Sequence, residues 1–194
     1  MDIENTENID LTNPTFGERG YIQVYTGDGK GKTTASLGLA LRALGRGWNV
    51  LIVLFAKGGH DYGELFTFRE LSPKLMKRLT LIQAGLDRIV YSTNKSEDDL
   101  KAVRGGWEKV KEAVKSRQYQ LIILDEANIA IDLDLIHVEE MVEFLQHKPP
   151  ELEIVLTGRR AHPKIIELAH LVSKIEPVKH YWDIGVNARE GIEF

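Results

Sequence analysis

Short apolar runs alternate with helical patterns along the chain. Six runs predict β-strands, at residues 21–26, 50–56, 79–83, 120–124, 153–157 and 171–175. Most of these runs are continuously apolar rather than alternating, which is typical of strands covered by helices on both faces. The pattern therefore predicts an α/β fold with a mostly parallel sheet of about six strands and helices on both faces.

Helical patterns fill the intervals between these runs. Residues 35–44, apolar nearly all round and ending near Gly45, predict a buried helix. A longer helix begins with Ser96 as its N-cap, carries acids in its first turn, and is weakened in its middle by Gly105-Gly106. The residues that this helix is expected to bury are Leu100, Val103, Trp107, Val110 and Val114.

Two further helices are expected in the second half of the chain. One follows Ile136 and stops before Pro149, and the other begins near Pro163 and runs to about residue 169. The first of the two is expected to bury Val138, Met141, Val142 and Leu145. Between the second and third strands, glycines and a Ser-Pro pair predict loops and a short helix.

Residues 26–34 carry the clearest chemical signal. They read Thr-Gly-Asp-Gly-Lys-Gly-Lys-Thr-Thr, after a predicted strand and at the start of a predicted helix. Glycines in that position let backbone N–H groups converge on a phosphate, while Lys32 reaches a terminal phosphate and Thr33 ligates Mg²⁺. The predicted ATP-binding residues of this stretch are Thr26, Gly27, Asp28, Gly29, Lys30, Gly31, Lys32, Thr33 and Thr34.

Thr26 departs from the P-loop pattern, which has glycine at that position. A β-branched residue resists positive φ, so we expect the tight turn one residue later, at Gly27. The alternative is a glycine-rich strand-to-helix turn without a phosphate. Lys32 and Thr33 at the helix start favour the P-loop, and with it a P-loop NTPase-like (RecA-like) fold.

Two acids follow the fourth predicted strand. Asp125 and Glu126 come directly after its apolar run, where nucleotide hydrolases and kinases hold magnesium. We expect this strand beside the P-loop strand, with Asp125 or Glu126 a few ångströms from Thr33. Thr33, Asp125 and Glu126 are therefore the predicted Mg²⁺ ligands, and solvated acids at a strand end are the alternative.

Further charged residues are expected at the carboxyl edge of the sheet, where open parallel sheets bind ligands. Arg159 follows the fifth strand and a glycine turn, and can hold a phosphate with two hydrogen bonds. Lys57 and Glu64 flank the glycine turn after the second strand, and Arg42 is expected to point back at the loop from its helix. A charged surface loop is the alternative for Lys57 and Glu64.

Length and composition suit one globular domain and limit its chemistry. The 194 residues are 43% hydrophobic and 28% charged, and predict a flexible acidic tail at 1–19 and a single domain at 20–194. The formal net charge of −4 gives no sign of a nucleic-acid partner. The apolar runs are too short to cross a bilayer and no signal peptide is evident, so we expect no membrane partner and a cytoplasmic location.

Several motifs, in order, resemble the P-loop family of ATP:corrinoid adenosyltransferases. They are residues 25–35, Lys57 with Gly63-Glu64, residues 124–126 and 156–159, and then 167–169, 178–180 and 191–194. The likeness covers about residues 20–194, and the family also has threonine at the position of Thr26. This recurrence of motifs is more specific than the P-loop by itself.

The resemblance implies transfer of the adenosyl group of ATP to the cobalt of a reduced corrinoid, with triphosphate leaving. It implies ATP as co-substrate, Mg²⁺ as cofactor and a homodimer, and we take Lys32 and Glu126 as the catalytic candidates. The family offers aromatic residues to the lower corrinoid face, and Tyr91 is the aromatic residue of the segment 84–92. Because the chain has no cysteine, we expect an external, flavin-based reductase to reduce the cobalt.

Two other functions fit the same residues. A P-loop ATPase or kinase would use Glu126 to activate water or a hydroxyl, and would release phosphate or diphosphate instead of triphosphate. A non-catalytic, ATP-responsive corrinoid-binding module would bind ATP without turnover. The reaction products therefore distinguish the three hypotheses.

Overall fold

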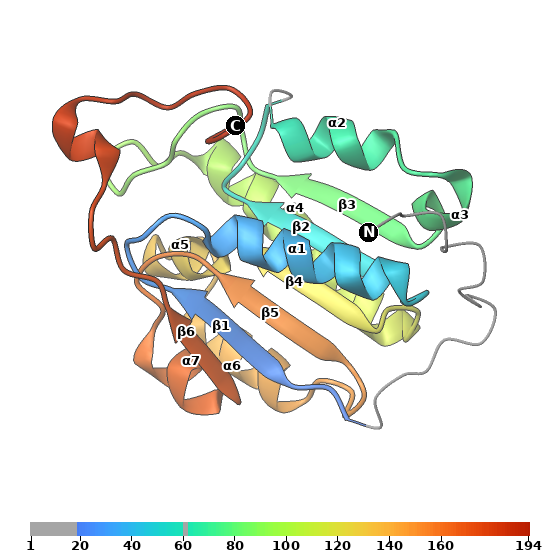
Figure 1. The fold of residues 1–194 in the computed structure, drawn as a ribbon. Helices are drawn as coiled ribbons and strands as arrows, with labels where there is room; N and C mark the ends of the chain where they lie inside the picture. The colour runs from blue at the N-terminus through green and yellow to red at the C-terminus, as the bar shows by residue number, and fades with distance from the viewer. Residues whose placement is uncertain (1–18, 60–61) are drawn as a thin grey trace.

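Six parallel strands in the order β3-β2-β4-β5-β1-β6 form the sheet of the computed structural model, which describes residues 19–59 and 62–194 (Figure 1). The strands are β1 (Ile22–Thr26), β2 (Val50–Phe55), β3 (Leu79–Ala84), β4 (Leu121–Asp125), β5 (Glu153–Thr157) and β6 (Leu171–Lys174). Every predicted strand is present, and the α/β fold with a parallel sheet is confirmed. The predicted tail at 1–19 lies outside the described residues, except for Arg19.

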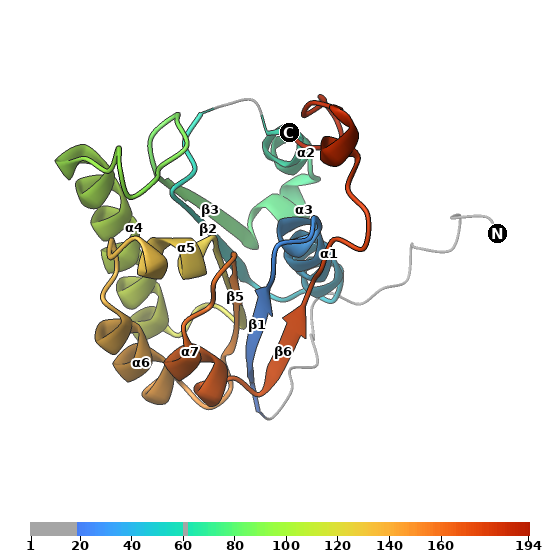
Figure 2. The same ribbon diagram turned by 90° about the vertical axis from the view of Figure 1, so that its left-hand side faces the viewer.

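Helices cover both faces of the sheet, as predicted. They are α1 (Lys32–Gly45), α2 (Gly63–Arg69), α3 (Pro73–Met76), α4 (Glu97–Ser116), α5 (Ala127–Asp132), α6 (Val138–Gln146), α7 (Pro163–Leu168) and the 3₁₀ helix η2 (Tyr181–Ile184). The helices α1, α2 and α3 lie on one face and α4 to α7 on the other (Figure 2). Each face has its own hydrophobic core, because the residues of β2 and β4 alternate between the two layers.

The lateral order of the strands differs from the prediction at one point. We expected β4 beside the P-loop strand β1, but β5 lies between them. An apolar run shows that a strand is covered on both faces, whereas its neighbours depend on where the crossover returns the chain to the sheet. Asp125, the last residue of β4, still lies near Thr33, because α1 packs across the residues of both β4 and β5.

Helix α1 is buried on one face only, so the prediction of a wholly buried helix was wrong. Leu37, Ala40 and Leu44 face the sheet, whereas Leu41 is 49% exposed. An apolar sequence is compatible with an exposed stripe when a single sheet covers the helix from one side. Residue composition does not distinguish this case from complete burial.

The predicted N-cap of α4 is confirmed, but one predicted core residue is wrong. Ser96 and Asp99 form a reciprocal capping box. This box turns Asp99 inward, and Leu100, next to it, is 41% exposed. Trp107 is completely buried, as predicted. Within the described ranges, no helix is long and apolar enough to cross a bilayer.

Candidate functional site

The segment between β1 and α1 has the glycine turns that the P-loop prediction requires. Gly27 and Gly31 have φ values of 95° and 119°, which places the tight turn at Gly27, as predicted, and leaves Thr26 in the strand. A Cβ on Gly27 would lie 2.3 Å from the carbonyl oxygen of Ile175, which follows β6. The Gly29 N–H donates to that same oxygen at 2.8 Å, so the chain after β6 packs directly against the loop.

Lys32 is the first residue of α1, and backbone carbonyls of the loop hold its ammonium group. Its Nζ donates to the oxygens of Gly27 at 2.8 Å and Gly29 at 2.6 Å. Burial lowers the pKa of Lys32, while the nearby carboxylate of Glu126 opposes this shift. Phosphate oxygens would replace two neutral carbonyls as acceptors and would form stronger, charge-assisted hydrogen bonds.

Asp125 is completely buried at the end of β4 and has three polar partners. Its Oδ1 accepts a hydrogen bond of 2.6 Å from the hydroxyl of Thr157, which in turn accepts from the Glu126 N–H at 3.0 Å. Its Oδ2 accepts from Lys57 Nζ at 2.7 Å and from Thr33 Oγ1 at 3.3 Å. Burial lowers the pKa of Lys57, but the charges of Asp125 and Glu126 outweigh that effect and raise it.

Glu126 follows Asp125 in a left-handed conformation, with φ of 56°. Its carboxylate lies against Gly158, where an added Cβ would be 3.1 Å from Oε2. Gly158 has φ of 124°, so this close approach requires glycine for conformational and steric reasons alike. Burial raises the pKa of Glu126, and Lys57 and Lys32 oppose this shift.

Arg159 and Lys30, two further residues predicted to bind ATP, contact different parts of the structure. Arg159 Nε lies 3.9 Å from Asp28 of the loop, so Arg159 reaches the P-loop. Lys30 instead donates to the Ile192 carbonyl at 2.6 Å and lies 3.2 Å from Glu193, near the end of the chain.

Four further candidates lie away from these contacts. Arg42 is in the last turn of α1, about 15 Å along the helix from Lys32 at 1.5 Å per residue, so the structure does not bring it to the loop. Glu64 is half-buried in the first turn of α2. Tyr91 is 57% exposed in the segment after β3, and Thr34 is exposed at the start of α1.

Thr157 and Asn128 are residues of the candidate site that were not predicted from the sequence. Thr157 links the ends of β4 and β5, and a polar residue closing an apolar strand was a usable signal for it. Asn128 Nδ2 donates to the carbonyl of Gly158 at 3.1 Å, and its Oδ1 is buried without a protein partner among the described residues. Nothing in the sequence around Asn128 indicated this contact.

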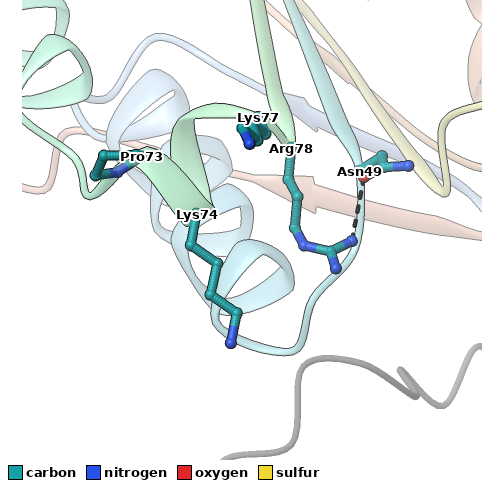
Figure 3. A pocket seen from close by; sticks show the side chains of 5 residues that line it. All are labelled: Asn49, Pro73, Lys74, Lys77 and Arg78. Carbon is teal, nitrogen blue, oxygen red and sulfur yellow. Dashed lines mark hydrogen bonds between the residues drawn. The ribbon is translucent and has the colours of Figure 1, made fainter.

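A hollow of the described surface lies elsewhere. It has a volume of about 450 Å³ and is lined by Asn49, Pro73, Lys74, Lys77 and Arg78, at the amino ends of β2 and β3 (Figure 3). The P-loop and the carboxylates lie at the carboxyl ends of the strands, so this hollow is not part of the same site.

The donor set at the carboxyl edge suits Mg²⁺. Hydroxyl and carboxylate oxygens are available from Thr33, Asp125 and Glu126, and Mg²⁺ prefers such hard ligands. Across the described ranges, no group of three or more His, Cys, Asp or Glu side chains is placed to hold a metal ion.

Comparisons with known proteins cover nearly the whole chain. The family model of the ATP:corrinoid adenosyltransferases BtuR/CobO/CobP matches residues 18–194. The corrinoid adenosyltransferase of Escherichia coli (strain K12) is 37% identical over 177 residues, which cover 91% of this chain and 87% of that protein. The corrinoid adenosyltransferase CobA of Salmonella typhimurium is 36% identical over 177 residues, with the same two coverages. An uncharacterized protein of Nostoc is 39% identical over 180 residues, but this chain spans only 48% of its length.

Proposed function

Because the chain belongs to the ATP:corrinoid adenosyltransferase family, we propose that it transfers the 5′-deoxyadenosyl group of ATP to the cobalt of a reduced corrinoid and releases triphosphate. One observation carries the proposal beyond family membership. Lys32 and Thr33 follow the glycine-rich loop at the start of α1. Thr33 Oγ1 lies 3.3 Å from Oδ2 of the buried Asp125 carboxylate. A displacement with triphosphate as leaving group needs such a concentration of donors and cations.

The protein residues act mainly by binding and by stabilising charge. In the displacement the cobalt lone pair forms the bond to the ribose 5′ carbon, and the bond from that carbon to oxygen breaks as triphosphate departs. In this proposal the loop N–H groups, Lys32 and Arg159 stabilise the negative charge that accumulates on the departing triphosphate. Binding both substrates at one edge of the sheet supplies the alignment of the reacting atoms.

We assign Thr33, Asp125 and Glu126 to a Mg²⁺ ion bound together with ATP. The ion would neutralise charge on the phosphate oxygens. Asp125 is also the residue that fixes Thr33 and Thr157 in place, through hydrogen bonds of 3.3 and 2.6 Å. Glu126, whose pKa is raised by burial, is the second catalytic candidate because its carboxylate faces the glycine turn that precedes Arg159.

The remaining partners are proposed from the family and the composition. We infer a homodimer and a cytoplasmic reaction, with Tyr91 on the corrinoid side. The chain contains no cysteine and therefore no dithiol of its own, so we propose that a separate, flavin-based reductase supplies the reduced cobalt.

Anaerobic incubation with ATP, Mg²⁺ and chemically reduced cobalamin tests the proposal directly. The expected result is a light-sensitive cobalt–carbon product, seen in the absorption spectrum, with one triphosphate released for each corrinoid adenosylated. Release of phosphate without this product would favour an ATPase instead. ATP binding without any turnover would favour a binding module.

A further inference from the structure

Lys57 occupies the position of a cation between the two side chains assigned to the metal. Its Nζ lies 2.7 Å from Asp125 Oδ2 and 3.2 Å from Thr33 Oγ1, and those two oxygens are themselves 3.3 Å apart. Two neighbouring ligands of an octahedral Mg²⁺ ion are about 3.0 Å apart, given metal–oxygen distances of about 2.1 Å. The oxygens are therefore spaced almost as metal ligands, and a lysine ammonium contacts both.

The contacts of Asp125 leave little capacity for a second cation. Lys57 and Thr33 donate to Oδ2, and Thr157 donates to Oδ1. The Lys57 side chain is only 19% exposed and Asp125 is fully buried, so water screens the pair weakly. A divalent ion arriving at these oxygens would have to displace the half-buried Lys57 ammonium or lie close to its positive charge.

The positive and negative charges at this edge of the sheet balance when Lys57 is counted. Among the groups that act on Lys32 and Glu126, the cations are Lys32, Lys57 and Arg159 and the anions are Asp28, Asp125 and Glu126, so the two signs are equal in number in this set. A free divalent cation would make this edge strongly positive, whereas a cation that arrives with a triphosphate would not. The local charge therefore favours the metal–nucleotide complex over the bare metal.

We propose that Lys57 is a positioning residue whose ammonium group takes the place of a metal cation between Thr33 and Asp125. In this position it excludes free divalent metal until ATP brings the metal in. This rests on the proposed use of Thr33 and Asp125 in metal binding. It assigns to Lys57 a role different from that of a phosphate ligand: Lys57 keeps the two side chains in place and controls which form of the metal can bind.

Mn²⁺ binding without nucleotide, followed by electron paramagnetic resonance of the free ion, tests the inference. Lys57→Met keeps an apolar stem of similar length and removes the charge, and should bind Mn²⁺ at least tenfold more tightly than the unmodified protein. Lys57→Arg retains a cation and should bind no more tightly than the unmodified protein. Lys57→Met combined with Asp125→Asn should lose the gain, because the new affinity depends on the Asp125 carboxylate that Lys57 no longer pairs.

Three outcomes would overturn the inference. They are unchanged Mn²⁺ affinity in Lys57→Met, a gain that persists in the double variant, and a gain of the same size in Lys57→Arg. If Lys57→Met fails to fold, the unmodified protein still decides: it should bind Mn²⁺ much more tightly with ATP than without it, and equal affinity would contradict the exclusion. None of these measurements uses a corrinoid, so failure of the adenosylation assay and failure of this inference remain distinguishable.

Discussion

Thr157 joins the ends of two strands that the site depends on. Its hydroxyl donates to Asp125 Oδ1 and accepts from the Glu126 N–H, and it is completely buried. Thr157→Val keeps the shape and removes both hydrogen bonds, which leaves a buried carboxylate oxygen and a backbone N–H unpaired. We expect a loss of about 1–3 kcal/mol in the free energy of unfolding, measured by urea denaturation. Thr157→Ser retains the hydroxyl and should lose clearly less.

Lys32 and Arg42 lie at opposite ends of α1, so they should differ in their effect on ATP. Lys32→Ala removes the ammonium group that we propose binds phosphate, and should weaken ATP binding by about 10- to 100-fold, or roughly 1.5–3 kcal/mol. Arg42→Ala is the control and should leave the affinity unchanged, because Arg42 is exposed in the last helical turn. Isothermal titration with ATP and Mg²⁺ measures both. Equal losses would mean that the nucleotide extends along the helix.

At the scale of the elements, adjacent glycines in α4 have opposite roles. A Cβ on Gly106 would lie 2.2 Å from the Cβ of Ala84 in β3, whereas a Cβ on Gly105 would meet no atom within 4 Å. Gly106→Ala should therefore push α4 from the sheet and cost about 1–3 kcal/mol of stability. Gly105→Ala should stabilise the helix by about 0.5–1 kcal/mol. Thermal unfolding of the two variants checks this difference in sign.

Glu140 connects α6 to α4 through three donors. Burial alone would raise its pKa, but hydrogen bonds from Arg104, Lys111 and Trp107 lower it from 4.5 to about 2. Since the folded-state pKa is the lower one, this stability is present above about pH 4.5 and is lost as the pH falls toward 2.

The Glu140→Gln variant tests this connection between the two helices. It should lower the free energy of unfolding by about 2–3 kcal/mol at pH 7, where the carboxylate is charged. The difference from the unmodified protein should shrink between pH 4.5 and pH 3, as measured by urea denaturation at each pH. A difference independent of pH would show that shape, not charge, makes the contact.

At the scale of the whole molecule, the strands and the loop were predictable from the sequence, whereas the lateral order of the strands was not. The continuous apolar run of β4 and the glycines around Lys32 determined the strand, the loop and their common edge, because these depend on residues close together in sequence. The place of β5 between β4 and β1 depends on crossovers that apolar periodicity does not specify. For the same reason Thr157 and Asn128 were missed, since their roles depend on neighbouring strands.

The path of the chain end was also unpredictable from local pattern. After β6 it passes the P-loop, where Ile175 N donates to Thr26 O at 2.8 Å, and it continues through η2 (Figure 1). It ends near the start of α2, where a Cβ on Gly63 would lie 3.9 Å from the carbonyl oxygen of Phe194. The final segment therefore connects the two sides of the carboxyl edge, over a distance of many residues in sequence.

Glu193 is the residue that holds this final segment together. Its carboxylate accepts from the Tyr181 hydroxyl and from the Arg189 N–H at 2.7 Å, and it lies 3.2 Å from Lys30 Nζ of the P-loop. The Tyr181 hydrogen bond is the main reason that the Glu193 pKa is lowered to about 2, so the group is charged at neutral pH. The Arg189 guanidinium also stacks 4.8 Å from the centroid of the Tyr181 ring.

Glu193→Gln should therefore loosen residues 180–190 and raise their amide exchange severalfold, as measured by hydrogen–deuterium exchange and mass spectrometry. Lys30→Met removes only the link to the P-loop, because the contacts of Glu193 with Tyr181 and Arg189 do not involve Lys30. Its effect on the same amides should be smaller. A larger effect of Lys30→Met would mean that the P-loop, rather than the local cluster around Glu193, holds the chain end in place.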